Sequence, residues 1–325
     1  MNTKVRRGPH GPGASNARKG VFVHTQNIDR LRQEVTGTAG FDSASAEVLH
    51  SWALSHVERL HTPDGGTVIF KCATEPFTHE DEALIAARQA GVDVPRVLIS
   101  TRGGTTLGML MEDLGQPCRQ ASDVEGVAAA RQLHSAAVPD FLSPGDTDWL
   151  ASLPGRALRT LTVLHENNRW ADTADIEITL GLLDKAAPTR AQGATLAPFG
   201  WVHSEFHPTS LLIGPDRVHM YDLARAFHGP GLLDLASWHG TIDPADPDRT
   251  RALLERYVQA GGPEETLADR GGLPAQDWAL GWHRVWIVEW YLAQAALWIA
   301  HEPDDHMYAR VVRTHIEEAV RLLNV

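Results

Sequence analysis

The segment from His203 to Ile213, together with Asp222, concentrates residues that could do chemistry. Glu205 lies in a turn-forming stretch between two histidines, where a carboxylate can accept the proton of an attacking hydroxyl group. Ser210 follows five residues later, and Asp222 ends the next apolar run. Carboxylate and other oxygen atoms are the ligands that Mg²⁺ prefers. This spacing predicts a general base and a metal site, with Asp222 as the principal ligand, around one short hairpin.

A zinc pair formed by His203 and His207 is the competing interpretation of this segment. Zinc hydrolases of the His-Glu-x-x-His type carry both histidines on one helix. Here the order is His-Ser-Glu-Phe-His, and Pro208 follows at once, which disfavours helical backbone at His207. We therefore disfavour zinc chemistry and expect His203 to bond to the backbone near the turn.

Two features in the first third of the chain could bind a nucleotide. Lys71 ends an apolar, strand-like run, and Glu82 lies on the predicted helix after it, so the carboxylate could orient the ammonium group toward phosphates. A later apolar run ends in an acidic linker whose backbone could hold an adenine edge: Met111, Glu112, Asp113 and Leu114. Each feature alone is equally typical of exposed side chains or of a loop between lobes. Their order relative to Glu205 and Asp222 favours the nucleotide site.

Length and composition set the broad class of the protein. With 325 residues and 43% hydrophobic content, the chain can bury a large core and fits two lobes better than one. Its net charge of −12 argues against nucleic acid as a partner, because nucleic-acid binding requires a basic surface. Two cysteines without paired spacing, Cys72 and Cys118, exclude a disulfide scaffold and suit a reducing cytoplasm.

The sequence shows neither a membrane anchor nor an export signal. The longest apolar run, Val285 to Ala300, is interrupted by Glu289 and Gln294 and is short for a membrane span. The first 20 residues are basic and lack the apolar core of a secretory signal. We therefore expect a cytoplasmic protein without membrane contact, whose residues 1–25 form a disordered tail.

Residues 26–113 are predicted to form a small lobe of strands around one helix. The turn Pro63-Asp64-Gly65-Gly66 lies between two apolar runs and predicts a hairpin. A helix is expected from His79 to Ala90, with Thr78 as its N-cap. Strands are expected at 57–60, 67–71, 96–100 and 106–111.

Residues 114–325 are predicted to form a larger, mostly helical lobe. Apolar residues at helical spacing predict helices at 124–137, 148–166, 174–187, 232–238, 247–260, 276–301 and 304–323. A strand-like interlude at 201–222 interrupts them. Four tryptophans recur at every fourth position of one helix, which places them on one face, mostly as core: Trp278, Trp282, Trp286 and Trp290. His134 is expected to be a packing or capping residue.

In their order along the chain, these residues resemble the aminoglycoside phosphotransferase and choline kinase-like family. The resemblance covers roughly residues 40–300, includes Gly91 to Val97 and Leu133-His134, and is most specific from His203 to Ala236. It implies a bilobal α+β fold like that of protein kinases, with a small β-rich lobe and a larger helical lobe. It also implies an enzyme that binds ATP with Mg²⁺ and phosphorylates a hydroxyl group, mostly on small molecules.

The resemblance assigns roles residue by residue. Lys71 would hold the ATP phosphates, Glu82 would orient Lys71, and residues 111–114 would line the adenine site. Asp222 matches a metal-binding Asp of the family. Asp234 matches a structural Asp that supports the catalytic loop. The helices after residue 240 would line the acceptor pocket.

Three departures from the family pattern bear on catalysis. Glu205 replaces the catalytic Asp and carries its carboxylate about 1 Å further out, a shift that can cost about 100-fold in rate. Ser210 replaces a metal-binding Asn, and its hydroxyl is a shorter ligand, although Ser binds Mg²⁺ in P-loop enzymes. The nucleotide-binding hairpin offers only Asp64-Gly65-Gly66 in place of a longer glycine-rich loop.

Three functions are compatible with these residues. The leading hypothesis is ATP-dependent phosphorylation of a hydroxyl on a small molecule, either an antibiotic or another secondary metabolite, in resistance or biosynthesis. A second keeps the fold but changes the acceptor to a Ser or Thr hydroxyl of a peptide in a natural-product pathway. A third is a catalytically impaired pseudokinase that binds nucleotide or a partner protein, and the presence of Lys71, Glu82 and Asp222 argues against it. The oligomeric state is open.

Overall fold

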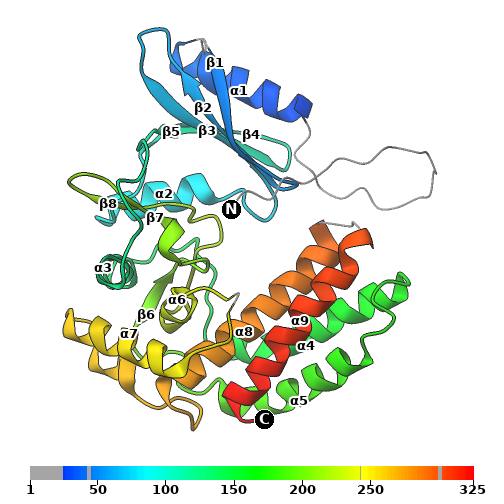
Figure 1. Cartoon of the computed structure of the whole chain (residues 1–325). Helices are drawn as coiled ribbons and strands as arrows, with labels where there is room; N and C mark the ends of the chain where they lie inside the picture. Colours follow the sequence, from blue (N-terminus) through cyan, green and yellow to red (C-terminus); the bar gives the residue numbers. More distant parts are fainter. Residues whose placement is uncertain (1–24, 42–44, 242, 299–301) are drawn as a thin grey trace.

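The computed structural model describes residues 25–41, 45–241, 243–298 and 302–325. A five-stranded sheet with two helices comes first, and a larger, mainly helical part follows, drawn below the sheet in Figure 1. The expected α+β architecture, with a β-rich part before a helical part, is therefore confirmed. The predicted tail at residues 1–25 falls outside the described residues except for Thr25.

The antiparallel sheet has the strand order β1-β2-β3-β5-β4. Its strands are β1 (Ser45–Ser51), β2 (Ser55–His61), β3 (Thr67–Thr74), β4 (Val97–Gly103) and β5 (Thr106–Glu112). The last four correspond to the predicted strands, whereas β1 was not assigned. Lys71 was expected at a strand end, but β3 continues beyond it and pairs it with Val57 on β2 and Met109 on β5. The lysine therefore projects from a central, rigid strand.

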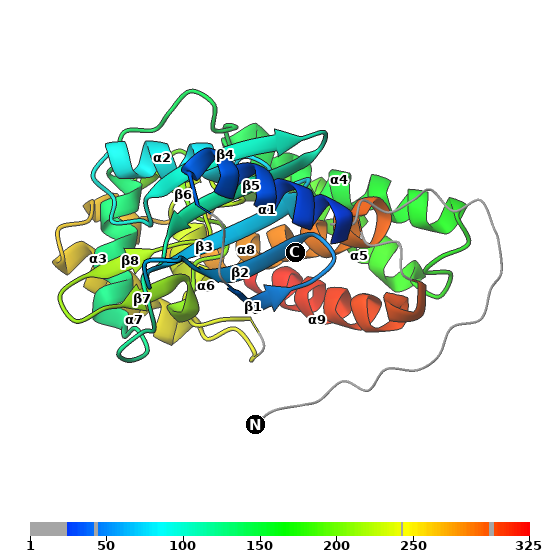
Figure 2. The same ribbon diagram turned by 90° about the horizontal axis from the view of Figure 1, so that it is seen from above.

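Helix α1 (Thr25–Ala39), which was not predicted, covers the face of the sheet that points away from the helical part (Figures 1 and 2). Leu31 and Val35 are buried in one cluster with Leu110 of β5. Gly108 permits this close approach, because a Cβ atom there would come within 2.9 Å of the Leu31 Cβ. The outer face of the sheet is thereby closed, and the inner face is left to form the site.

Helix α2 (Glu80–Gln89) matches the predicted helix. One face of it is buried through residues at positions i, i+3, i+4 and i+7: Glu80, Ala83, Leu84 and Ala87. The predicted N-cap is wrong: His79 precedes the helix, and the Thr78 hydroxyl instead donates to the Glu75 carboxylate over 3.0 Å.

The helical part contains α3 (Asp123–His134), α4 (Thr147–Glu166), α5 (Ala174–Arg190), α6 (Leu232–Ser237), α7 (Pro247–Gln259), α8 (Ala275–Ala293) and α9 (Asp305–Leu323). Helix α8 packs against α4 and α9 at the centre of this part. Its first two stripe tryptophans, Trp278 and Trp282, are buried in the core as predicted. The helix is shorter than predicted, because a π-helical turn, Gln294–Trp298, follows Ala293.

Two short antiparallel strand pairs interrupt the helices. Strand β6 (Phe199–Val202) pairs with β9 (Phe227–Pro230), and β7 (Leu211–Ile213) pairs with β8 (Val218–Met220). The loop that carries Glu205 starts where β6 ends, and Asp222 follows β8. Glu205 and Asp222 therefore both lie just after strands, whose pairing fixes the position of the chain there. Among the described residues, no helix combines the length and the hydropathy needed to cross a membrane.

Candidate active site

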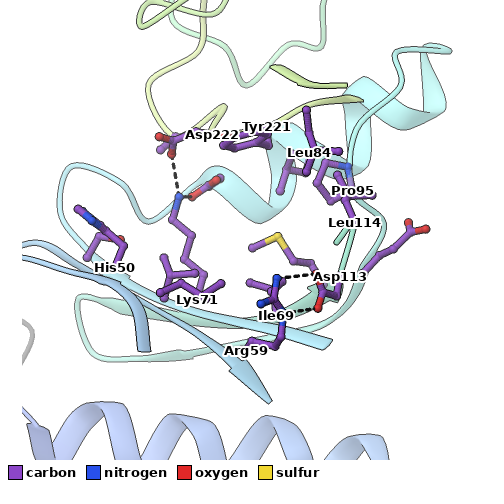
Figure 3. A pocket seen from close by; sticks show the side chains of 18 of the residues that line it. His50, Arg59, Ile69, Lys71, Leu84, Pro95, Asp113, Leu114, Tyr221 and Asp222 are labelled. Carbon is purple, nitrogen blue, oxygen red and sulfur yellow. Dashed lines mark hydrogen bonds and ion pairs between the residues drawn. The ribbon is translucent and has the colours of Figure 1, made fainter. Parts of the chain in front are cut away.

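A cavity of about 500 Å³ lies between the inner face of the sheet and the hairpin that ends at Asp222 (Figure 3). Most of the predicted site residues line it: Lys71, Met111, Glu112, Asp113, Leu114, Glu205 and Asp222. Glu82 and Ser210 are not among the lining residues. Its apolar walls include Val57 and Ile69 from the sheet and Leu84 from α2.

Lys71 forms the electrostatic centre of this cavity. Its Nζ lies 2.6 Å from Glu80 Oε2 and 2.7 Å from Asp222 Oδ1, and the side chain is almost fully buried. Burial by itself lowers the pKa of Lys71, but the two carboxylates outweigh it and raise the pKa above its usual range. The ammonium group is therefore charged at neutral pH and held in one position.

The partner of Lys71 on α2 is Glu80, so the prediction of Glu82 for this role is wrong. Glu82 lies on the exposed side of the helix, where it pairs with Arg102 over 2.8 Å. Two residues along a helix amount to about 200° of rotation, so Glu80 and Glu82 cannot face the same side. Burial raises the pKa of Glu80 to about 7, although Lys71 opposes this shift.

Asp222 provides the exposed carboxylate of the cavity. Its backbone has φ +67°, in the left-handed region that Asp tolerates better than most residues. About 45% of its side chain is accessible, against 2% for Glu80. The Lys71 ammonium group lowers the pKa of Asp222, so the carboxylate is ionised at neutral pH. Of the two carboxylates on Lys71, only Asp222 has an open side for a ligand.

The loop that carries Glu205 is fastened by the fully buried Asp234. The Asp234 carboxylate accepts the backbone N–H groups of His203 (2.7 Å) and Ser204 (2.9 Å). His134 adds a contact from its Nε2 to Asp234 over 3.2 Å, and its Nδ1 lies 3.1 Å from the Tyr257 hydroxyl. The structural role expected for Asp234 is confirmed, and His134 supports it in addition to packing.

His203 connects this loop to the strand end that carries Asp222. Its Nδ1 accepts the backbone N–H of Glu205 (3.3 Å), so its Nε2 carries the proton and donates to the Tyr221 carbonyl (2.9 Å). The expectation that His203 bonds to nearby backbone is confirmed. Both ring nitrogens are used in this way, which leaves neither for zinc.

The Ser210 hydroxyl is engaged inside the same loop. It donates to the Glu205 carbonyl (2.7 Å) and accepts the His207 backbone N–H (3.3 Å), and the residue is buried. A metal-binding role for Ser210 would require the loop to open. We assign Ser210 to holding the backbone on both sides of the Glu205 turn.

Arg225 was missed in the sequence, and it holds the Glu205 side chain. Its Nη1 donates to Glu205 Oε1 over 3.1 Å, and its guanidinium group lies 3.6 Å from the Trp290 ring centre and 4.7 Å from that of Trp286. Burial lowers the pKa of Arg225, and Glu205 opposes the shift. The only sequence signal was its position three residues after Asp222.

The linker after β5 and the turn between β1 and β2 complete the cavity. Asp113 pairs with Arg59 over 2.6 Å and accepts the Gly115 backbone N–H over 2.9 Å, which orders the linker (Figure 3). The β1–β2 turn contributes Trp52. The glycine-containing turn at 64–66 joins β2 to β3 and does not line the cavity, so its assignment as the nucleotide-binding loop is wrong.

A protein-family model, the phosphotransferase enzyme family, matches residues 53–275. The matched segment contains the charged residues of the site, from Lys71 and Glu80 to Glu205, Asp222 and Arg225, whereas Trp52, Trp286 and Trp290 lie outside it. The chain belongs to this family. Membership makes it a phosphotransferase whose acceptor is a hydroxyl group. A search of curated proteins found no match.

Several solved structures share the fold of this phosphotransferase. A choline kinase from Streptococcus pneumoniae has a TM-score of 0.60 at 12% identity, covering 91% of this chain and 99% of that one. An amicoumacin kinase in complex with AMP-PNP, Ca²⁺ and its ligand has a TM-score of 0.60 at 12% identity, with coverages of 91% and 94%. An aminoglycoside-3′-phosphotransferase of type VIII has a TM-score of 0.55 at 18% identity, with coverages of 82% and 100%.

Proposed function

We propose that this phosphotransferase uses ATP and Mg²⁺ to phosphorylate a hydroxyl group of a small molecule, an antibiotic or another secondary metabolite. One observation carries the proposal. The Lys71 ammonium group is fixed between Glu80 and Asp222 in the same cavity that Glu205 borders. A fixed cation, an accessible carboxylate for a metal and a second carboxylate for proton transfer are the parts that phosphoryl transfer requires.

The cavity suits a nucleotide in size and in the distribution of polarity. Its volume of about 500 Å³ lies within the range of cofactor sites. The apolar walls formed by Val57, Ile69 and Leu84 would contact the adenine ring, and the linker backbone at residues 111–114 would bind its edge. Lys71 would then meet the phosphates.

The residues present fit a magnesium ion bound together with a nucleotide. Among the described residues no group of three or more His, Cys, Asp or Glu side chains could form a complete metal cage. Mg²⁺ in phosphotransferases is usually held by one or two carboxylates and by substrate phosphates, with several waters. Asp222 supplies such an exposed, ionised carboxylate. The ion, when bound, neutralises charge on the phosphate oxygens.

Glu205 would act as the general base. Its carboxylate takes the proton of the acceptor hydroxyl as the new O–P bond forms and the bond from phosphorus to the nucleotide's leaving oxygen breaks. Arg225 holds Oε1 of this carboxylate, so the longer Glu side chain has a defined position. The contact with Arg225 would therefore fix the carboxylate of Glu205, although its side chain is one methylene longer than that of Asp.

The test is a transfer assay with purified protein, ATP and Mg²⁺ against hydroxylated metabolites and Ser/Thr peptides. We expect ATP binding with a dependence on divalent cations and transfer to at least one small-molecule alcohol. Transfer confined to peptides would support the peptide kinase. Binding of ATP without transfer to any acceptor would support a pseudokinase, and no nucleotide binding would overturn the proposed site.

A further inference from the structure

A second cavity, of about 320 Å³, lies beside the Glu205 loop. It is lined by that loop and by helix α8, with Trp286, Ile287, Trp290 and Tyr291 among its walls. Glu205 lines both cavities. A molecule in this second cavity could therefore bring a hydroxyl group to Glu205 while the first cavity holds the nucleotide.

The wall of the second cavity carries almost no net charge. Glu205 is the one acidic residue that lines it within the described ranges, and Arg225 pairs with that carboxylate over 3.1 Å. Two histidines, His207 and His283, also line it. Burial lowers the pKa of His283 to about 3 and lowers that of His207 as well, so both rings are neutral at pH 7. A polycationic acceptor would find no uncompensated carboxylate here.

Two aromatic rings of the wall, those of Trp286 and Trp290, already contact a cation of the protein itself. The guanidinium group of Arg225 lies 3.6 Å from the centre of the Trp290 ring and 4.7 Å from that of Trp286. Aromatic rings bind ammonium groups through their faces. A second cation at these two rings would be repelled by the Arg225 guanidinium group beside it.

Three side chains in the wall have hydrogen-bonding atoms without a partner among the described residues. They are Ser204 Oγ, His283 Nδ1 and the indole Nε1 of Trp286, and each of these atoms is buried. All three residues line the second cavity. Since buried polar groups are nearly always paired, these atoms are candidates for hydrogen bonds with polar atoms of an occupant.

We propose that the second cavity binds an uncharged alcohol with a flat, apolar body and a few neutral polar groups, and that Arg225 excludes cationic acceptors. The inference rests on the proposed function for the role of Glu205. It separates this chain from the choline kinase and the aminoglycoside phosphotransferase that share its fold, whose names specify cationic acceptors.

The test uses two alcohols that have the same shape and differ in charge: choline and 3,3-dimethylbutan-1-ol. A third probe, 2-phenylethanol, is neutral and flat. Dissociation constants are measured from the tryptophan indole N–H signals in NMR spectra of the ¹⁵N-labelled protein, with Trp286 and Trp290 assigned through their Phe variants. We expect the neutral isostere to bind at least about tenfold more tightly than choline, and 2-phenylethanol more tightly still.

Two Arg225 variants provide the matched control. Arg225→Met removes the charge and keeps much of the length, so the preference for the neutral alcohol should shrink or reverse as the ring faces open. Arg225→Lys keeps the charge and should retain the preference. Each variant is accepted only if its thermal melt and spectrum show a folded protein. Equal or tighter binding of choline by the unmodified protein, or no measurable binding of any neutral probe, would overturn the inference.

This binding experiment is independent of phosphoryl transfer, so the two proposals can fail separately. Loss of ATP binding to the first cavity, with neutral alcohols still bound at Trp286 and Trp290, would remove the proposed function alone. ATP-dependent transfer that is faster to choline or to an aminoglycoside than to neutral alcohols would remove the acceptor class alone.

Discussion

The two cavities that meet at Glu205 are built on different physical principles. In the first, a buried lysine is shared by two carboxylates from separate elements, and one of these carboxylates stays accessible. In the second, a buried arginine neutralises one carboxylate and spreads over two indole rings. In the first cavity a charged carboxylate remains accessible to a ligand, whereas in the second cavity the arginine and the carboxylate neutralise each other.

The comparison shows how one wall residue can serve two environments. Phosphate and a divalent cation carry high charge and require fixed, exposed counter-charges. A neutral alcohol requires an apolar wall with a few hydrogen-bonding groups. Glu205 lies at the boundary of the two cavities, and its partner Arg225 also lines the second cavity.

The largest effect is expected from removing the exposed charge of the first cavity. Asp222→Asn keeps the shape but removes the anion that would hold the metal, so kcat should fall by about 10³-fold or more. The measurement is initial-rate transfer at saturating ATP, with a thermal melt as the control for folding. A rate within tenfold of the unmodified protein would contradict the metal role of Asp222.

The residue shared by both cavities should have the next largest effect. Glu205→Gln removes the proton acceptor and should lower kcat by about 10² to 10³-fold. Nucleotide binding should change little, because Lys71 and Asp222 remain in place. A matched Glu205→Asp variant keeps a carboxylate but draws it away from Arg225, and we expect an intermediate loss of about tenfold to 100-fold. Equal activities for the Gln and Asp variants would argue against a base at this position.

Two neighbouring glutamates on α2 test whether the ion pair of the first cavity is functional. Glu80→Gln should lower kcat/KM for ATP by about 10 to 100-fold, because the charge-assisted contact that fixes Lys71 is lost. Glu82→Gln removes an exposed pair with Arg102 and should change kcat/KM by less than about twofold. Titration with a fluorescent ATP analogue measures the same difference as affinity. Similar losses in both variants would contradict the assignment of Glu80.

The smallest effect concerns the apolar character of the second cavity. The unfolded chain protonates His283 below its ordinary pKa of 6.5, whereas the folded protein resists protonation down to about pH 3. The unfolded state therefore binds more protons in this window, and the free energy of unfolding falls as pH falls from 6.5 toward 3.

Urea unfolding at pH 7 and pH 5 measures this decline. His283→Gln should make it shallower, by at most about 1.4 kcal/mol per pH unit. Burial also lowers the pKa of His315, to about 4. His315 should therefore preserve part of the dependence of the unfolding free energy on pH in the variant. An unchanged slope in His283→Gln would show that the ring is hydrated.

The elements that carry the site could be predicted from the sequence. Strand-like runs around Lys71, the helix after it and the loop from His203 have local signals in apolar spacing and turn residues, and the structure contains each of them. The sequence also carries a signal for Glu80, rather than Glu82, as the partner of Lys71. Ala83, Leu84 and Ala87 mark the buried face of α2, and Glu80 lies on that face at helical spacing.

Other features had weak signals or none. Helix α1 had a readable pattern in Ile28, Leu31 and Val35, but its place over the sheet depends on Gly108 in a strand far along the chain. The engagement of the Ser210 hydroxyl within its own loop could not be read from residue type. The same Ser could have faced a metal if the loop had adopted another turn.

The sequence by itself determined which elements form and which acids stand at their ends, because hydrophobic periodicity, turns and caps act between residues close along the chain. Only the tertiary structure decided which charges meet. Lys71 and Asp222 are 151 residues apart, and Arg225 reaches Trp290 on another element. Such pairs depend on how whole elements pack. The same packing leaves an accessible charged group in the first cavity and pairs the charges of the second cavity with each other.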